Sequence, residues 1–295
     1  MTQRVALDAL NSAAPAEFVT LLAGVFEDAD WIAERACAER PFPTVADLHD
    51  AMMRAVRQAS TAEQIAFVAG HPDLAGKAVR AGAVGGASMS EQAGLGLDRL
   101  SDAEFAQFER LNAAYRQRFR FPFVICVRRQ TRDAVLAAFE RRLVNEPAAE
   151  LAAAIDEIGH ISRLRLVDRV DGAGMPAVAG RLSTHVLDTY HGRPAEGVAV
   201  ELYEVGRSAR AQLAAARTNS NGRTDQPLLT GEPLRIGTYE LQFHLGDYFR
   251  ACGVIGAAHP FLDVVPLRFG IAEPEGQYHV PLVATPWSYA TYRGS

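Results

Sequence analysis

The chain has 295 residues, which exceeds the roughly 100 to 200 residues of a typical single domain, so two domains are expected. Its hydrophobic content of 48% and charged content of 22% provide enough apolar material for two cores in a soluble protein. A net charge of -5 excludes the strongly basic surface that nucleic-acid and anionic-membrane binders carry, so charge names no partner.

Metal and targeting motifs are missing from the sequence as well. Cys37, Cys126 and Cys252 are far apart and form no CxxC pair, which argues against a disulfide framework or a structural zinc site. No apolar run of signal-peptide length begins the chain, and no stretch approaches the roughly 18 apolar residues that cross a bilayer. We therefore expect a reduced, cytoplasmic protein without a membrane or nucleic-acid partner and without a metal.

Up to about residue 168 the apolar residues follow a helical period. One apolar helix face in "PAEFVTLLAGVFED" is formed by Phe18, Leu21, Leu22, Val25 and Phe26. Ser101 and Glu104 form a capping box at the start of another helix. A further helix is expected at 131–144, and Pro147 suits the first turn of the next one. The sequence predicts an all-α domain at 1–168.

Three polar residues of this half are candidate site residues. His71 in "VAGHPDLAG" ends an apolar helical stretch, and Pro72 biases it away from helical geometry. Glu91 follows a loop rich in Gly, Ala and Ser. Arg165 lies on the apolar stripe of its helix, where it needs a buried partner or an anionic ligand, whereas Arg163 points to the opposite, solvated side. A capping histidine and a solvated glutamate explain the first two residues as well as a catalytic role does.

Longer motifs contain these residues. "GVFEDADWIAERA…RPF", "HPDLAG", "S..EQAG.GLD", "LN..Y..RF.FPFVI" and "I..LRL" occur in order over about residues 10 to 167. They resemble the decarboxylases of 2-oxo-4-hydroxy-4-carboxy-5-ureidoimidazoline (OHCU), although "EDA" stands where "EHS" is frequent. The resemblance implies that His71 is the general acid or proton relay, Glu91 its partner, and Arg165 the anchor for the anionic side of the substrate. The other implied ligand contacts are Pro72, Ser88, Met89, Ser90, Gln92, Phe123, Val124, Ile125, Cys126 and Val127.

Beyond this half the apolar period changes to two. Small residues, Gly and Pro without a period predict a linker at 169–179. Two alternating runs follow, with Val198, Val200 and Leu202 in one and Tyr239, Leu241, Phe243 and Leu245 in the other. Asn-Gly in "NSNGRT" is a tight-turn signal. We expect a small antiparallel β-sandwich at 180–295, so the chain is predicted to be a multidomain protein with an all-α half and an all-β half.

The β half contains two candidate histidines and an arginine. In "QYHVPLVATPW" the apolar residues share one strand face, so His279 projects to the other face. His185 lies in another short strand beside Asp188, and Arg223 follows a tight turn. Each of these residues alone is as typical of a surface or packing role.

The combination of motifs is more specific. "STHVLDT…GRPA.GV", "TN..GR", "YHVPL" and a terminal "YRGS" occur in order over about 110 residues. This half resembles the 5-hydroxyisourate hydrolases, which are transthyretin-like enzymes of urate breakdown. The resemblance implies a site lined by His185, Arg223, His279, Tyr292, Arg293, Gly294 and Ser295, formed between the subunits of a tetramer.

These residue types suit the hydrolysis of an anionic, nitrogen-rich ring. Imidazoles titrate near neutral pH and can orient and deprotonate a water molecule. A guanidinium can hold the oxygen on which negative charge grows during attack on a carbonyl. The sequence has no Ser-His-Asp elbow, so we expect direct attack by water without a covalent enzyme intermediate. Neither half calls for a cofactor.

The two resemblances describe consecutive steps, since the hydrolase product OHCU is the decarboxylase substrate. We therefore expect a bifunctional, allantoin-forming enzyme that acts on small purine catabolites. A homo-oligomer is expected, with a tetrameric hydrolase core and decarboxylase domains that pair as dimers. Two alternatives stay open at this point: only one half is active, or the β half binds a small molecule without chemistry, as transthyretin does.

Overall fold

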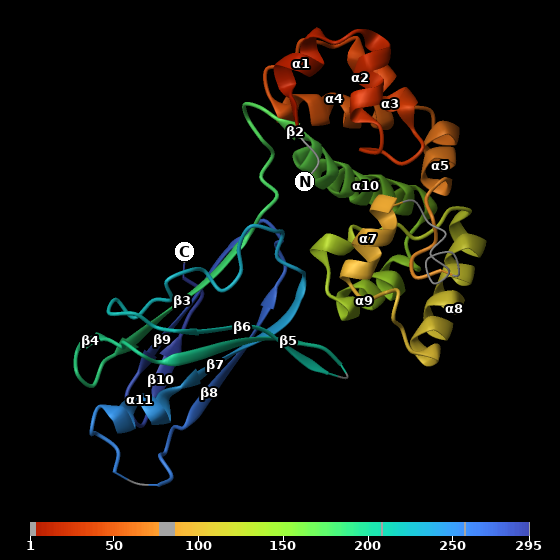
Figure 1. Ribbon diagram of the computed structural model, residues 1–295. Coiled ribbons are helices and arrows are strands. Elements are labelled where there is room, and N and C mark those ends of the chain that lie inside the picture. The colour runs from red at the N-terminus through yellow and green to blue at the C-terminus, as the bar shows by residue number, and fades with distance from the viewer. Residues whose placement is uncertain (1–3, 77–85, 208, 257, 295) are drawn as a thin grey trace. The chain divides into compact units, whose positions relative to one another are not determined.

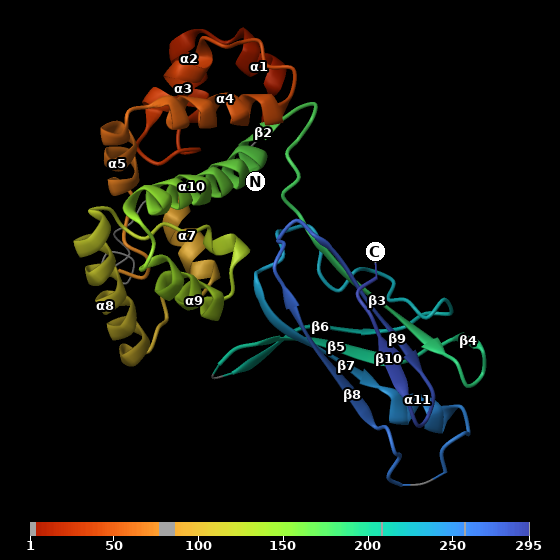
Figure 2. The ribbon, with the colours of Figure 1, turned by 180° about the vertical axis from the view of Figure 1, so that it is seen from behind.

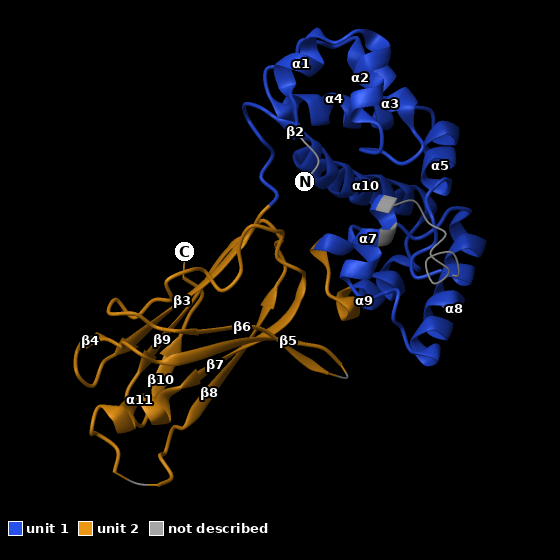
Figure 3. Cartoon of the chain, viewed as in Figure 1, with its two compact units in different colours: residues 1–128, 135–178 blue, residues 129–134, 179–295 orange. Residues whose placement is uncertain are grey.

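The computed structural model describes residues 4–76, 86–207, 209–256 and 258–294. The chain divides into two compact units (Figure 3). Unit 1 comprises residues 1–128 and 135–178, and unit 2 comprises residues 129–134 and 179–295. A helical half followed by a β half confirms the predicted fold class.

Helices dominate the first half of the chain (Figure 1). They are α1 (Leu7–Ser12), α2 (Pro15–Leu22), α3 (Asp30–Cys37), α4 (Val45–Gln58), α5 (Thr61–Ala69), α7 (Gly86–Gly94), α8 (Asp102–Phe119), the 3-10 turn η1 (Val127–Arg129), α9 (Arg132–Arg142) and α10 (Pro147–Arg169). The predicted capping box at the start of α8 is confirmed, because Ser101 and Glu104 each bond to the backbone N–H of the other. Ser60 and Glu63 form a second capping box at the start of α5.

The first predicted helix is shorter than its apolar pattern. The pattern continues to Phe26, but α2 ends at Leu22. Gly24 adopts a φ of +82°, a left-handed conformation that interrupts the helix. Val25 and Phe26 are still buried, although they lie in the turn before Glu27 and not in the helix. The apolar spacing thus predicted their burial but not their secondary structure.

The long helix α10 runs through the middle of unit 1. In both views it lies between the group α1 to α4 and the group α7 to α9 (Figures 1 and 2). Pro147 begins it, at a position where the missing N–H costs no hydrogen bond. Ile158 and Leu166 are buried on α10, and Arg165 reaches a cavity from its side. Because α10 packs against α4 and α5, this packing fixes the direction in which Arg165 points.

Part of the expected linker is bound to unit 1. Val170 and Asp171 form β2, which pairs in parallel with β1 (Val5–Ala6). The first backbone N–H groups of α4, from Val45 and Ala46, donate to the carbonyls of Ala173 and Gly174 at 2.9 and 3.1 Å. These bonds satisfy donors that a helix start otherwise leaves to water.

Unit 2 is a sandwich of two four-stranded sheets. The strands are β3 (Arg181–Asp188), β4 (Arg193–Pro194), β5 (Ala199–Val205), β6 (Arg210–Arg217), β7 (Gly237–His244), β8 (Val264–Ile271), β9 (Gln277–Ala284) and β10 (Tyr289–Thr291), with the helix α11 (Leu245–Ala251) after β7. One sheet has the order β10-β9-β3-β4 and the other β6-β5-β7-β8. The expectation of a purely antiparallel sandwich is wrong, because β3 and β9 pair in parallel. These strands are distant in sequence, so no hairpin constrains their direction.

The predicted alternation is confirmed at the apolar positions. Val198, Val200 and Leu202 are fully buried, as are Leu241 and Phe243 in β7. The exception lies on the opposite face of β7, where Glu240 is only 6% exposed. Its carboxylate is covered by salt bridges from Arg268 of the adjacent strand β8 and from Arg210 of β6, which lies beyond β5.

Among the described residues, no helix is long and apolar enough to cross a bilayer. The three cysteines are free. In the same residues, no group of three or more His, Cys, Asp or Glu side chains is arranged to hold a metal ion.

Candidate active sites

A small cavity of about 40 Å³ lies within unit 1. Eight residues of the predicted decarboxylase set line it: His71, Pro72, Ser88, Glu91, Gln92, Phe123, Val124 and Arg165. They come from the end of α5, from α7, from the segment after α8 and from α10. The cavity is also lined by Glu27, Leu74 and Ile161, which were not predicted as site residues.

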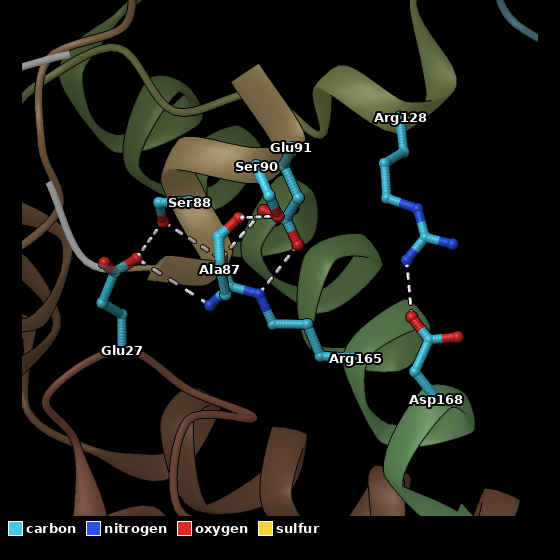
Figure 4. Close-up of polar contacts among 8 residues, drawn as sticks. All are labelled: Glu27, Ala87, Ser88, Ser90, Glu91, Arg128, Arg165 and Asp168. Carbon is cyan, nitrogen blue, oxygen red and sulfur yellow. Dashed lines mark hydrogen bonds and ion pairs between the residues drawn. The ribbon is translucent and has the colours of Figure 1, made fainter. Parts of the chain in front are cut away.

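Arg165 is the centre of the polar contacts in this cavity (Figure 4). Its Nε and Nη2 atoms donate to the two carboxylate oxygens of Glu91 at 3.0 and 2.9 Å, a bidentate pair. Nη2 also donates to Ser88 Oγ at 3.1 Å, and this hydroxyl donates to Glu27 Oε2 at 2.6 Å. The Arg165 side chain is only 10% exposed, so these contacts are shielded from water. An arginine on the apolar stripe of α10 has thus found buried partners.

His71 is buried at the edge of the same cavity. Its Nδ1 lies 3.2 Å from the carbonyl oxygen of Phe67, and a carbonyl only accepts, so Nδ1 carries the hydrogen. The neutral ring therefore has its lone pair on Nε2. Burial lowers the pKa of His71 below its ordinary value, and Arg165 adds to this, while the Glu27 carboxylate acts in the opposite direction.

The expected pairing of His71 with Glu91 is not formed in this structure. Both carboxylate oxygens of Glu91 face Arg165 instead. The carboxylate that acts on the His71 ring is Glu27, which the turn between α2 and α3 supplies. Sequence spacing could not distinguish two glutamates that lie near the same arginine.

The remaining predicted ligand contacts of this half lie outside the cavity lining. Ser90 is exposed on α7, where its hydroxyl donates to the Ala87 carbonyl (Figure 4). Ile125, Cys126 and Val127 are buried in the unit instead. The backbone N–H of Cys126 donates to Glu157, so this N–H is not free to bind a ligand. Met89 lies in α7, and its side chain is outside the described part of the chain.

A buried ionic network holds the cavity wall at Val124. Arg142 Nη1 donates to the Val124 carbonyl at 2.8 Å, and the same guanidinium binds the fully buried Glu150. Tyr115 Oη also donates to Glu150. The ring of Phe123 lies under the Arg142 guanidinium at 4.7 Å. This network holds the backbone of the segment after α8 in place.

In unit 2, the parallel pairing of β3 with β9 brings the two candidate histidine strands together. Ser183 lies opposite His279, and His185 lies opposite Pro281. Residues two apart share a strand face, so Ser183 and His185 lie on the same side of β3. Ser183 Oγ lies 3.0 Å from His279 Nδ1 and holds this ring. Ser183 was missed in the sequence, although its spacing from His185 was a usable signal.

Arg223 and the chain end approach these histidines through backbone contacts. Arg223 forms a β-bridge with His185, and Gly294 forms one with His279. The Gly294 N–H donates to the His279 carbonyl at 2.9 Å. A Cβ at Gly294 would lie 2.7 Å from His279 Cδ2, so only glycine fits without a shift.

The surroundings of both histidines favour the neutral ring. Burial lowers the pKa of His185, and the Arg223 guanidinium lowers it further. Burial also lowers the pKa of His279, with Arg223, His185 and Arg181 as additional causes. Nε2 of His185 is buried and makes no hydrogen bond within the described residues.

The other named residues of this half differ in their positions. The side chain of Tyr292 is 60% exposed. Arg293 is also exposed and lies over the Tyr278 ring, at 4.7 Å from its centroid. Ser295 is outside the described residues. Asp188 points away from His185, because it is fully buried and accepts hydrogen bonds from His191 and Tyr248.

The two halves match different protein families. Residues 11–167 match the family model of OHCU decarboxylase, and residues 182–294 match that of the HIUase/Transthyretin family. A 5-hydroxyisourate hydrolase 2 of Rhizobium meliloti is 54% identical over 117 residues, which are 40% of this chain and 98% of that protein. A 2-oxo-4-hydroxy-4-carboxy-5-ureidoimidazoline decarboxylase of Haloferax volcanii is 41% identical over 152 residues, which are 52% of this chain and 88% of that protein.

One solved structure spans both halves. The crystal structure of (S)-allantoin synthase is 34% identical, with a TM-score of 0.56, and the match covers 99% of this chain and 100% of that one. The chain therefore belongs to the OHCU decarboxylase family through its helical half and to the HIUase/transthyretin family through its β half.

Proposed function

We propose that this chain is a bifunctional enzyme of urate degradation. Its β half hydrolyses 5-hydroxyisourate to OHCU, and its helical half decarboxylates OHCU to (S)-allantoin. The observation that carries this proposal is the presence of both families in one chain, since their reactions are consecutive. The full-length match to an (S)-allantoin synthase supports it independently.

For the hydrolase step, we assign His185 and His279 to the activation of water. A neutral imidazole accepts a proton from water while the oxygen attacks a ring carbonyl, and the proton then passes to the leaving ring nitrogen as the C–N bond breaks. Arg223 stabilises the oxygen on which charge grows. Ser183 fixes the His279 ring through the contact with Nδ1, so that Nε2 is the nitrogen for proton transfer.

For the decarboxylation step, we assign His71 to proton transfer and Arg165 to the anionic side of the substrate. The bond between the ring carbon and its carboxylate breaks, carbon dioxide leaves, and the imine of the ring takes up the electron pair. His71 then delivers a proton to that carbon, a contribution of about 10² to 10⁴ in rate. Neither step needs a cofactor in this scheme.

We further propose a homo-oligomer with a tetrameric hydrolase core and paired decarboxylase domains. The likeness of unit 2 to the transthyretin family supports the first part. In one chain His185 and His279 are half-buried, whereas Arg223, Tyr292 and Arg293 are exposed, so a partner subunit has room to cover this site. A cytoplasmic location stays a prediction from the sequence.

A coupled assay tests the two activities separately. Urate oxidase generates 5-hydroxyisourate, absorbance follows its decay, and circular dichroism follows the formation of optically active allantoin. His71→Asn and His279→Asn keep a nitrogen close to Nδ1, and each should stop one step only. The matched control is His259→Asn, since His259 is exposed and far from both sets of residues in sequence.

Three outcomes of this assay contradict the proposal. Unchanged spontaneous decay of 5-hydroxyisourate would make the β half a binding protein. Racemic allantoin would leave the helical half without activity. Loss of both steps from either single change would contradict two independent sites.

A further inference from the structure

Glu27 is the unassigned charged group of the decarboxylase cavity. Its side chain is 19% exposed, it accepts the hydrogen bond from Ser88, and its Oε2 lies 3.8 Å from Arg165 Nη1 (Figure 4). It lies in the turn before α3, distant in sequence from every other polar residue of the cavity. The Ser88 hydroxyl and the Arg165 guanidinium thus keep a charged carboxylate at the wall of the cavity.

The charges of the cavity do not suit an anionic substrate as they stand. Arg165 contributes one positive charge, and Glu27 and Glu91 contribute two negative charges, while His71 is neutral because of its burial. The net charge of the lining is therefore -1. A substrate carboxylate brings a second negative charge into a shielded cavity, where like charges repel strongly. Binding becomes favourable if the cavity takes up one proton together with the anion.

We propose that Glu27 is a positioning residue of the decarboxylase: its carboxylate is the counter-ion that lets His71 hold this proton while the substrate carboxylate is bound. The inference rests on the proposed decarboxylase function. Glu91 cannot serve in the same way, because its two oxygens are engaged by Arg165. Ser88 donates a hydrogen bond to Glu27 and accepts one from Arg165, so a single hydroxyl positions both the counter-ion and the residue that binds the anion.

The proton balance of the reaction agrees with this arrangement. A carboxylate that loses carbon dioxide needs one proton at the carbon that it leaves. His71 in its protonated form supplies that proton and becomes neutral, with no other reactant. The proton taken up on binding is then the one that the reaction consumes, and each turnover starts from the neutral imidazole.

Two charged side chains and two backbone groups act on the pKa of His71. Glu27 favours the imidazolium and Arg165 disfavours it. The carbonyl of Phe67 accepts from Nδ1 and also favours the charged ring. The next acidic residue in the chain, Asp73, is paired with Arg116 at 2.7 Å. Glu27 is thus the carboxylate whose removal should change the protonation of His71.

The test compares Glu27→Gln with Glu27→Asp in the full chain. Gln keeps the shape and an oxygen for the Ser88 hydroxyl but removes the charge, whereas Asp keeps the charge. Decarboxylation is followed by circular dichroism between about pH 6 and 9, with a separate 5-hydroxyisourate hydrolase in excess so that OHCU supply is not limiting. Glu34→Gln, the same change at an exposed position of α3, is the matched control.

In Glu27→Gln we expect the alkaline limb of the kcat profile to move to lower pH by about one unit, because the imidazolium of His71 loses its counter-ion. At pH values above this limb, kcat should fall by a factor on the order of ten. Glu27→Asp should restore the limb in part, and Glu34→Gln should match the unmodified chain. The helical signal in the far-ultraviolet circular dichroism of each variant, and its thermal unfolding, report that unit 1 is folded.

Two results overturn the inference alone. They are an unshifted limb in Glu27→Gln, and equal losses in Glu27→Gln and Glu27→Asp at every pH. If the unmodified chain does not accelerate OHCU decay, the proposed function itself fails, and the inference fails with it.

Discussion

A buried histidine of α4, packed against α10, should make the stability of the helical unit sensitive to acid. His49 of α4 is 8% exposed, and its Nε2 lies 3.0 Å from Oγ of Ser162 in α10. Burial lowers the pKa of His49 from 6.5 to about 4, and Arg163 contributes to the same shift. We expect His49→Gln to remove this pH dependence, because Gln can keep a hydrogen bond to Ser162 without titrating.

The sign and size of the effect follow from proton linkage. Below pH 6.5 the unfolded chain binds a proton at His49, whereas the folded chain does so only below about pH 4. The unfolded state therefore gains from acid, and stability is lost as pH falls through this window. The gap between the two pKa values corresponds to roughly 3 kcal/mol, of which about 2 kcal/mol is lost between pH 7.5 and pH 5.

Denaturant unfolding measures this slope for unit 1 alone. The chain has two tryptophans, so Trp31 reports on the helical unit in a Trp287→Phe background. The loss of unfolding free energy between pH 7.5 and pH 5 should be about 2 kcal/mol smaller in His49→Gln than in the background chain. His259→Gln, at an exposed position of unit 2, should leave the slope unchanged. Equal slopes with and without His49 would refute the reasoning.

Two further predictions concern the hydrolase site. Gly294→Ala should lower hydrolase kcat/KM by about 10²-fold, because the added Cβ displaces the chain end from His279. The decarboxylation rate and the thermal unfolding temperature should stay unchanged. Full hydrolase activity in this variant would contradict a role for the contact. Arg223→Gln should raise the pKa of His185 and His279, and so move the acid limb of the hydrolase pH profile to higher pH. Arg223→Lys keeps the charge and should leave the limb in place. An unmoved limb in Arg223→Gln would show that Arg223 does not affect the titration of these histidines.

Patterns within one element were the part of the structure that the sequence predicted well. The alternation around Val200 and the capping box at Ser101 depend on neighbours a few residues apart, and both are found. The periodicity of α10 likewise separated Arg165, which reaches the cavity, from Arg163 on the other side. Arg163 is half-buried in a groove with His160 rather than fully solvated, which a single helix pattern cannot show.

Contacts between distant segments were not predictable in the same way. Ser88 and Glu27 are 61 residues apart, and nothing in either local pattern indicates that they bond. The same limit applies to Glu240, whose strand pattern predicts an exposed side chain. Its burial depends on Arg210 and Arg268, and therefore on the order of strands in the sheet, which the local sequence pattern does not predict.

In the proposed reactions, the buried histidines of the two sites have opposite roles in proton transfer. Burial lowers the pKa of His71, His185 and His279 alike. A general base must be neutral to act, so in the hydrolase site the guanidinium of Arg223 adds to the effect of burial. A general acid must hold a proton, so in the decarboxylase site the effect has to be opposed, and there the nearby group is the carboxylate of Glu27. At His71 the Glu27 carboxylate thus opposes burial and Arg165, whereas at His185 and His279 the charged neighbours act in the same direction as burial.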